Sequence, residues 1–467
     1  MKPSSKKKNI IIAIILIFIF FLFLIFKIFS NSSKNENYFD KIISITDSKN
    51  ESLQKDIYVK TVLTPNFENI LHKYSDTEST VNGTDKNTIH SYGNIYDSIL
   101  KKFIGLKNIN ILEIGVYSGS FLNVLNEYLP SANLYGFDIT LDNIKIKKND
   151  KIKLFKGDCS KSDTLNLLPS DLYFDLIIED GSHDPHEQIK TFEIFNKKLK
   201  NEGMYIIEDI NKSNKNHVLQ SVNNICNEKK LNLRYFDLRY IKNRFDDIIA
   251  VISKKTNILV SVFAIYARND NYKNILKFIN DHCDMIIIIY SKNKDYDFDI
   301  GYLKNLKNYI LIEVENIGYD LFKYYIGLEY IISNNIKYSN ILLINDSFTF
   351  SRNIDDFFSF IKKTNADFIG INNSLQLKNH FHSFIWVFDE YIVSEFIKYF
   401  IKNFKNNMNQ KNIVDVFEIG FSSYIMNKLE YISKSFYNVN FNGNPTSYPL
   451  LDKMINEYDY PIRKTKI

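Results

Sequence analysis

Two apolar runs of the sequence each end in a pair of acidic residues. The first run ends in Glu179 and Asp180, with His183 just beyond, and the second ends in Glu208 and Asp209. Such runs are typical of strands buried on both faces of a parallel sheet, where ligands lie outside the carboxyl ends. If the two strands are neighbours, these ends lie about 4.8 Å apart. The carboxylates of Asp180, Glu208 and Asp209 are therefore predicted to share one hard divalent cation. His183 is predicted to act beside it as a base.

A glycine-bearing turn precedes these runs. The strand predicted over residues 110–114 leads into Gly115 and Gly119, and glycine lets the backbone approach a ligand at a helix N-terminus. The next strand ends at Asp138, which is placed to bind ribose hydroxyls, and the third ends at Asp158, suited to an adenine amino group. The absence of a G-x-G-x-x-G pattern argues against a dinucleotide, so the pattern fits S-adenosylmethionine. The candidate cofactor-binding residues are Tyr92, Glu113, Gly115, Tyr117, Asp138 and Asp158.

Composition sets wide limits. The 467 residues, 45% of them hydrophobic, allow two large domains with packed cores. The formal net charge of +5 is small and diffuse, which argues against a nucleic-acid partner. Lys, Asn and Ile are abundant throughout, including in predicted loops, so runs of these residues carry little functional information.

The N-terminus predicts a membrane anchor. Residues 10–26 contain no polar side chain and would span about 26 Å as a helix, close to a hydrocarbon core of about 30 Å. A cleaved signal peptide is the alternative, but the apolar stretch is long and no small-x-small site follows Ile28. Lysines before the stretch favour a cytosolic N-terminus. We therefore expect a single-pass type II membrane protein that contacts the membrane through residues 10–29.

The rest of the chain predicts two α/β domains. Residues 1–30 form the tail and anchor, 31–66 a stalk, 67–255 a first domain and 256–467 a second. In the first, strands are predicted at 110–114, 133–138, 151–156, 173–178, 204–207, 231–237 and 247–253, with helices at 121–128, 186–199 and 218–227. In the second, strands are predicted at 258–266, 285–290, 309–314, 340–344 and 368–371, with helices at 271–282, 322–334, 354–363, 393–404 and 422–429. Such alternation indicates mostly parallel, doubly wound sheets.

The first domain resembles a known enzyme family. The residues that carry the resemblance are Thr84-Asp85-Lys86, His90-Ser91-Tyr92, Tyr96, Leu112-Glu113-Ile114-Gly115, Tyr135-Gly136-Phe137-Asp138, Asp180-Gly181-Ser182-His183 and Ile207-Glu208-Asp209-Ile210. They are similar to the macrocin and mycinamicin type of sugar O-methyltransferase, a metal-dependent branch of the class I, Rossmann-like methyltransferases. The resemblance implies Mg2+ on Asp180, Glu208 and Asp209, with His183 as the general base. The pattern departs at Glu179, where Asp is usual, and at Ser91, where Gly is common.

The second domain carries another ordered set of motifs. They are Asn316-Ile317-Gly318-Tyr319-Asp320, Asn345-Asp346-Ser347, His380-Phe381-His382-Ser383-Phe384 and Glu418-Ile419-Gly420-Phe421-Ser422. In this order they resemble the rhamnan-synthesis F type of glycosyltransferase-like domain. The resemblance implies a fold of the glycosyltransferase A type and a nucleotide sugar as donor substrate. Asp346 would lie near the sugar diphosphate, Asp320 could contact the donor, and Glu418 is a candidate base. A single Asp stands where a pair is common, which leaves metal dependence open.

Together these features predict a membrane-anchored, bifunctional glycan-modifying enzyme that methylates a sugar hydroxyl and transfers a sugar to a glycan acceptor. The alternative is a single active methyltransferase whose C-terminal domain binds glycans or serves as a scaffold. A structural protein with decayed domains is a third interpretation, and the complete set of Asp180, His183, Glu208 and Asp209 argues against it. The sequence leaves a homo-oligomer open.

Overall fold

The computed structural model describes residues 41–47, 66–75, 83–146, 150–254, 256–437, 447 and 450–464. The chain forms two compact units, Met1–Ile43 and Ser44–Ile467. Of the first unit only residues 41–43 are described, at the start of strand β1 (Ile42–Asp47). The second unit holds two separate β-sheets, and we call the parts around them the N-terminal α/β region (residues 66–254) and the C-terminal α/β region (residues 256–464). The four domain boundaries expected from the sequence stay predictions.

The predicted single-pass membrane localisation is corrected by the described part of the chain, in which no helix is long and apolar enough to cross a membrane. Among the described residues the longest helices, α7 (Lys215–Lys229) and α10 (Tyr319–Ser333), have 15 residues each. A helix of that length spans about 22 Å, which is short of a hydrocarbon core of about 30 Å. The segment 10–29, on which the expectation rested, lies outside the described residues.

The N-terminal α/β region is built on a seven-stranded sheet with the order β4-β3-β2-β5-β6-β8-β7. The strands β2 to β6 run parallel, and β8 pairs antiparallel to both β6 and β7. Its strands are β2 (Asn110–Ile114), β3 (Asn133–Asp138), β4 (Ile152–Lys156), β5 (Phe174–Glu179), β6 (Leu199–Ile207), β7 (Leu231–Asp237) and β8 (Ile248–Lys254). Its helices are α3 (Phe67–Lys73), α4 (Gly93–Leu100), η2 (Lys101–Phe103), α5 (Ser120–Tyr128), η3 (Ser162–Leu167), α6 (Pro185–Phe195), η4 (Asn196–Lys198), α7 and α8 (Arg239–Lys242).

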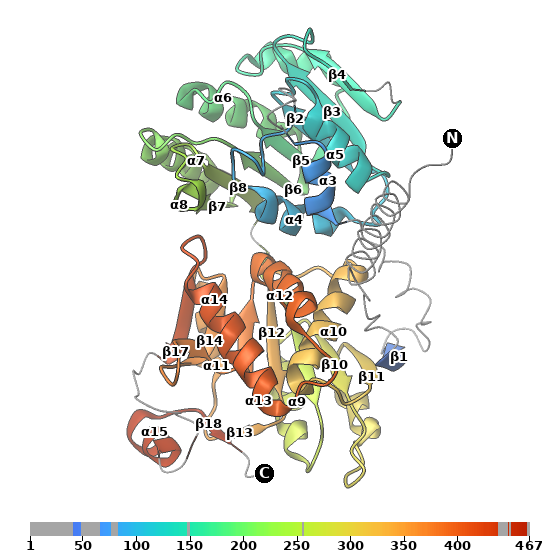
Figure 1. The fold of residues 1–467 in the computed structure, drawn as a ribbon, viewed down its shortest axis with the longest axis vertical. Helices are drawn as coiled ribbons and strands as arrows, with labels where there is room; N and C mark the ends of the chain where they lie inside the picture. The colour runs from blue at the N-terminus through green and yellow to red at the C-terminus, as the bar shows by residue number, and fades with distance from the viewer. Residues whose placement is uncertain are drawn as a thin grey trace, which may run out of the picture. The chain divides into compact units, whose positions relative to one another are not determined.

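Helices cover both faces of this sheet, which confirms the predicted doubly wound fold. Figure 1 shows α6 and α7 on one side and α3, α4 and α5 on the other, and the helices of each group pack against one another. Consequently β2 and β5 are buried along nearly their whole length, as their continuous apolar runs predict. The strand order reverses between β2 and β5, and ligands of such sheets bind outside the carboxyl ends at this switch point.

The C-terminal α/β region has a second sheet, in which the strands follow the order β11-β10-β9-β12-β16-β14-β15, with β17 beside β14. Its strands are β9 (Leu259–Ile265), β10 (Met285–Tyr290), β11 (Tyr309–Val314), β12 (Asn340–Asn345), β14 (Phe368–Ser374), β15 (His380–Phe381), β16 (Ile385–Phe388) and β17 (Ser433–Tyr437), while β13 (Phe348–Phe350) pairs with β18 (Ile462–Lys464). Its helices are α9 (Asn271–His282), η5 (Ile300–Asn305), α10, α11 (Asp355–Lys363), α12 (Glu390–Asn403), α13 (Gln410–Ile413), the π-helix η6 (Val414–Phe421), α14 (Ser422–Met426) and α15 (Leu450–Tyr458).

Two helical layers enclose this second sheet. Side chains of α9, α11 and α15 share one hydrophobic cluster with β9, β10 and β12, whereas α10 packs with α12. β16 inserts antiparallel between β12 and β14, so the sheet is mixed. A mixed α/β fold is thus confirmed for both regions, and assignment of the second to the glycosyltransferase A type stays a prediction.

Candidate active site

The acidic residues of the N-terminal α/β region meet at one edge of its sheet. β5 and β6 are neighbours in parallel register, and the amide of Glu208 still donates to the carbonyl oxygen of Glu179 over 3.0 Å. Asp180, Glu208 and Asp209 follow directly after these strands, as the sequence predicts. Since Glu208 and Asp209 are buried and Asp180 is half-buried, negative charge is concentrated away from bulk water.

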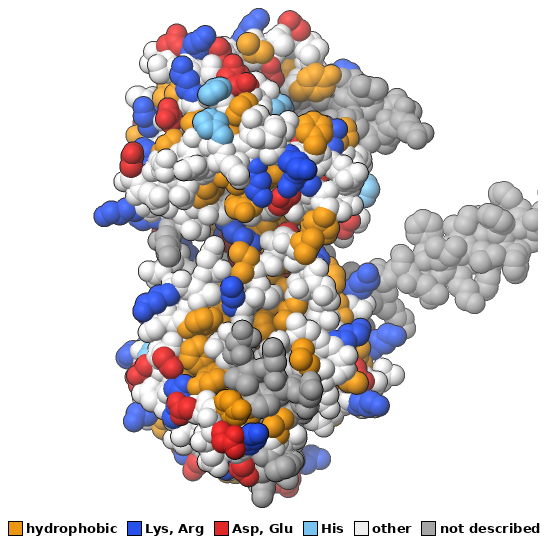
Figure 2. Space-filling view, turned by 90° about the vertical axis from the view of Figure 1, so that its left-hand side faces the viewer, with side chains coloured by type: hydrophobic (Ala, Val, Ile, Leu, Met, Phe, Trp, Pro, Cys, Tyr) orange, Lys and Arg blue, Asp and Glu red, His pale blue; other side chains and the backbone are white. Residues whose placement is uncertain are grey.

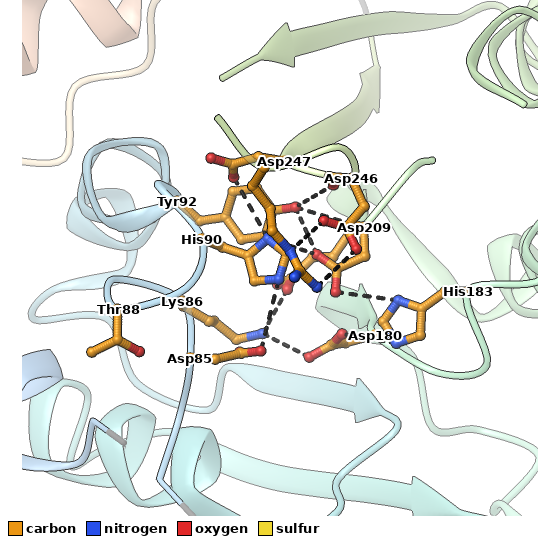
Figure 3. A network of polar contacts seen from close by, with 12 residues as sticks. Asp85, Lys86, Thr88, His90, Tyr92, Asp180, His183, Asp209, Asp246 and Asp247 are labelled. Atoms are coloured by element: carbon orange, nitrogen blue, oxygen red, sulfur yellow. Dashed lines mark hydrogen bonds and ion pairs between the residues drawn. The ribbon is translucent and has the colours of Figure 1, made fainter. Parts of the chain in front are cut away.

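Asp180, His183 and Asp209 form one cluster whose potential ligand atoms all lie within 4.8 Å of one another. The His183 Nδ1 is 3.2 Å from Asp209 Oδ2, and its Nε2 is 3.9 Å from Asp180 Oδ1 (Figure 3). His183 and Asp209 have φ of 58° and 52°, a left-handed conformation that non-glycine residues rarely adopt. Burial and the Asp180 charge raise the pKa of Asp209 to about 6, although His90 and His183 oppose this.

Lys86 neutralises part of this charge. Its buried ammonium donates to Asp180 Oδ2 over 2.8 Å (Figure 3). It also donates to Glu208 Oε2 over 2.6 Å. Burial disfavours the charged amine, but the Asp180 and Glu208 carboxylates outweigh that cost and raise the pKa of Lys86. The Tyr96 hydroxyl donates to Glu208 Oε1. Both Glu208 oxygens are therefore engaged, and the structure groups His183 rather than Glu208 with the other two expected cation ligands.

Tyr92 and His90 support Asp209 from the other side. The Tyr92 hydroxyl donates to Asp209 Oδ1 over 2.7 Å, and its fully buried ring stacks on His90 with centroids 5.0 Å apart. His90 Nδ1 lies 3.3 Å from Asp209 Oδ1 and 3.6 Å from Asp247 Oδ1. Burial lowers the pKa of His90, but contacts with Asp247 and Asp209 outweigh it and raise the value. The structure thus brings Tyr92 to the acidic cluster rather than to the glycine turn.

The glycine turn lies against this acidic edge. Gly115 has φ of 85°, and a Cβ added there would lie 1.9 Å from the Asp180 carbonyl oxygen, so glycine is required twice over. Tyr117 has φ of 49°, and its amide donates to Asp138 Oδ2 over 2.8 Å. The turn, Asp138 and the acidic cluster therefore lie at adjoining strand ends, as a cofactor-binding edge requires. Asp158 follows β4 and accepts hydrogen bonds from Ser160.

Glu113 offers an unsatisfied group at this edge. The side chain is buried near the end of β2, and its Oε2 has no hydrogen-bond partner within the part of the chain that the structure describes. Burial raises the pKa of Glu113 to about 8, despite the nearby Lys86. A buried orphan oxygen is costly and suits a ligand that donates to it. The residues present thus fit both S-adenosylmethionine, at Glu113, Gly115, Tyr117 and Asp138, and a hard cation, at Asp180 and Asp209.

The C-terminal α/β region places its predicted residues at the corresponding edge of the second sheet. Asn345 ends β12, and its side-chain amide donates to Asp320 Oδ2 over 2.7 Å. Asp346 Oδ2 accepts from the backbone amide of Tyr266 over 3.1 Å. Burial and the Asp320 charge raise the pKa of Asp346 to about 7, and Lys323 opposes this. Asp320 and Asp346 thus lie close enough for their charges to interact, and we call these residues with Asn345 the Asp320–Asp346 network.

Glu418 has hydrogen-bond partners of its own, although Lys464 interacts with it as well as with Asp320 and Asp346. Its Oε2 accepts from the Ser383 amide over 2.7 Å and from the Ser383 hydroxyl over 2.5 Å, and its Oε1 is 3.6 Å from His382 Nδ1. Burial would raise its pKa, but His382 and Ser383 hold it down at about 2. The predicted role of Glu418 as a base stays a prediction.

The comparison with protein families agrees with the geometry of the N-terminal α/β region. The family of FtsJ-like methyltransferases matches residues 96–297. The chain therefore contains an FtsJ-like, S-adenosylmethionine-dependent methyltransferase domain, which confirms the predicted activity and cofactor at this level. The matched range runs past β8 into β9, α9 and β10. Because β9 and β10 pair within the second sheet, we place the end of the methyltransferase sheet at β8.

Several solved structures resemble part of the chain. MycE methyltransferase from the mycinamycin biosynthetic pathway, in complex with Mg and SAH, shares 18% identity over 41% of this chain and 55% of its own, with a TM-score of 0.32. The plantazolicin methyltransferase BpumL shares 16% identity with this chain over 43% of this chain and 98% of its own, with a TM-score of 0.28. The N-methyltransferase NodS from Bradyrhizobium japonicum shares 15% identity over 37% of this chain and 100% of its own, with a TM-score of 0.29. This chain thus spans about half the length of MycE. No curated protein matches the sequence significantly.

The surface carries no dominant charge on the face in view. Figure 2 shows basic and acidic side chains interspersed there, in keeping with the small net charge of +5. A glycan acceptor and the lack of a nucleic-acid partner stay predictions, and so does the possibility of a homo-oligomer.

Sequence reasoning missed the roles of Lys86, Tyr96 and His90. All three stood in motifs used for the family resemblance, yet nothing in their local pattern assigns them partners 94 or more residues away. A buried lysine in a lysine-rich chain has no signal of its own before the fold is known.

Lys86→Met should destabilise the protein strongly, because it leaves the buried Glu208 and the half-buried Asp180 without their counter-charge. We expect a loss of about 3 kcal/mol in the free energy of unfolding, measured by urea denaturation at neutral pH. Lys73→Met is the control, since the Lys73–Glu127 ion pair is exposed and should contribute little. Equal losses in the two variants would contradict the assigned role of Lys86.

Glu113→Gln should flatten the pH dependence of stability. The folded pKa of about 8 exceeds the ordinary value of 4.5, so the native state keeps a proton that the unfolded state has lost, and stability falls as pH rises between these values. The fall in Tm from pH ~5.5 to pH ~8, measured calorimetrically without ligand, should be smaller in Glu113→Gln than in the wild type. The exposed Glu68→Gln should behave like the wild type.

Proposed function

We propose that the N-terminal α/β region methylates a sugar hydroxyl and depends on Mg2+. The observation that carries this proposal is the cluster of Asp180, His183 and Asp209 beside the glycine turn. Two carboxylates favour a hard cation over a softer one. Bound there, such a cation would lower the pKa of a sugar hydroxyl, and S-adenosylmethionine would supply the electrophilic methyl group.

His183 is suited to take the proton of that hydroxyl. It is 40% exposed, so a substrate can reach it, and the Asp209 carboxylate, with Oδ2 3.2 Å from Nδ1, favours the ring proton on that nitrogen. This leaves Nε2 as the proton acceptor, the arrangement by which a carboxylate selects a histidine tautomer. Lys86, Tyr92 and Tyr96 hold the carboxylates in place, which keeps the hydroxyl, the base and the methyl donor aligned.

His183→Gln should reduce methyl transfer by about 10²- to 10⁴-fold, the usual contribution of a general base. Transfer is measured with methyl-labelled S-adenosylmethionine, Mg2+ and mixed glycans, and cofactor binding should persist because His183 lies outside the glycine turn. The exposed His186→Gln in the following helix should leave transfer unchanged.

Asp180→Ala should also abolish transfer and spare cofactor binding. Loss of binding in Asp180→Ala would mean that Asp180 contacts the cofactor, and labelling without Mg2+ would refute the metal dependence.

We further propose that the C-terminal α/β region transfers a sugar from a nucleotide donor. The network of Asp320, Asn345 and Asp346 at the carboxyl ends of the strands supports this, since ligands of such sheets bind there. Lys323 and Lys464 lie close enough to Asp320 and Asp346 to influence their charge, and lysines are suited to a sugar diphosphate. The two activities together would make the chain a bifunctional glycan-modifying enzyme.

Asp346→Asn should abolish slow hydrolysis of one member of a panel of nucleotide sugars, because Asp346 lies at the centre of this network. The exposed Asp281→Asn on α9 is the matched control and should retain the wild-type rate. Hydrolysis is measured by release of the nucleoside diphosphate, and donor binding by calorimetry. If no donor binds the wild type, the glycosyl-transfer proposal fails and the alternative of a glycan-binding or scaffold module gains.

A further inference from the structure

Three side chains of the C-terminal α/β region converge beside the Asp320–Asp346 network, and the Lys464 ammonium lies close enough to interact with Glu418 as well as with Asp320 and Asp346. His380 begins β15, His382 follows it, and Glu418 extends from the π-helix η6. Their potential ligand atoms all lie within 4.8 Å of one another. His380 and His382 are only 2% and 5% exposed, so these polar rings are held in the protein interior.

The hydrogen bonds around the rings leave one ligand atom on each side chain. His380 Nδ1 lies 2.7 Å from the Lys378 carbonyl oxygen, so Nδ1–H donates to it and Nε2 keeps its lone pair. His382 Nε2 is buried and has no hydrogen-bond partner among the described residues. Both hydrogen bonds from Ser383 reach Glu418 Oε2, and Oε1 faces the histidines, 3.6 Å from His382 Nδ1. Outer hydrogen bonds of this kind orient the ligands of protein metal sites.

The backbone that carries these residues is fixed by the core. The Phe381 amide, between the two histidines, donates to the buried Ser422 hydroxyl over 2.7 Å. Phe381 packs against Gly370, where an added Cβ would lie 2.3 Å from the ring. In the π-helix, Phe417 is fully buried, and this packing fixes the position of the neighbouring Glu418. π-helical turns are rare and frequently occur at functional sites.

We propose that His380, His382 and Glu418 bind a zinc-type divalent cation. Two imidazoles and one carboxylate are a ligand set of catalytic zinc sites, which keep a fourth position open for water or substrate. Imidazole favours Zn2+ over the hard cations Mg2+ and Ca2+. The proposal adds a cation site next to the Asp320–Asp346 network and does not require that the region transfers a sugar.

The test is a zinc titration of the full-length chain in excess Mg2+, with metal content measured after desalting. We expect one tightly bound Zn2+ per chain, a rise of Tm with zinc, and a visible d–d absorption when Co2+ replaces it. His380→Gln and His382→Gln should each lower zinc affinity by at least about tenfold. His282→Gln is the control, because His282 belongs to the same region and pairs with Asp355 but lies in no such cluster.

A second variant separates this site from the methyltransferase cluster, which also contains a histidine. Asp180→Ala should keep the bound zinc and the Co2+ spectrum, even though it should lose methyl transfer. Zinc that disappears in Asp180→Ala and persists in His382→Gln would overturn the proposal. So would a wild-type protein that binds no zinc and shows no rise of Tm, whatever the folding of the variants, which is checked by circular dichroism.

Discussion

The crowding of negative charge at the ends of β5 and β6 is the constraint on which the N-terminal α/β region depends. Two carboxylates 4 Å apart repel each other by about 4 kcal/mol at the effective dielectric constant of a protein surface. The segment that precedes the first strand of the sheet offsets this repulsion, with the Lys86 ammonium on Asp180 and Glu208 and the Tyr92 hydroxyl on Asp209. Docking of residues 83–100 on the sheet is therefore electrostatic as well as apolar.

The same edge holds unusual backbone conformations. Tyr117, His183 and Asp209 are non-glycine residues with positive φ, and they come from three different strand ends of one site. Such residues cost of order 1–3 kcal/mol each and persist only where the surrounding structure enforces them. Hydrogen bonds hold two of these conformations: the Tyr117 backbone amide donates to the Asp138 carboxylate, and the Asp209 backbone amide donates to the Tyr92 hydroxyl. The strain aims the side chains of His183 and Asp209 at each other.

Sequence alone predicted the parts of the structure that depend on local pattern. The strands at 110–114, 133–138 and 285–290 have the predicted bounds, because continuous apolar runs end abruptly in polar residues. The π-helix η6 and the antiparallel insertion of β16 were not predicted, since both depend on tertiary packing rather than on periodicity. The role of Lys86 was missed for a related reason: its partners lie 94 and 122 residues further along the chain.

The clusters of the two regions differ in position and in donor chemistry. The N-terminal cluster lies where the parallel strands β5 and β6 end and offers two carboxylates and one histidine. The C-terminal cluster lies at the antiparallel strand β15 and the π-helix η6 and offers two histidines and one carboxylate. In the first, excess negative charge requires Lys86; in the second, hydrogen bonds from Ser383 stabilise the single carboxylate. Because oxygen ligands favour Mg2+ and imidazoles favour Zn2+, the two proposed sites would select different cations. A single chain would then load both sites without competition between them.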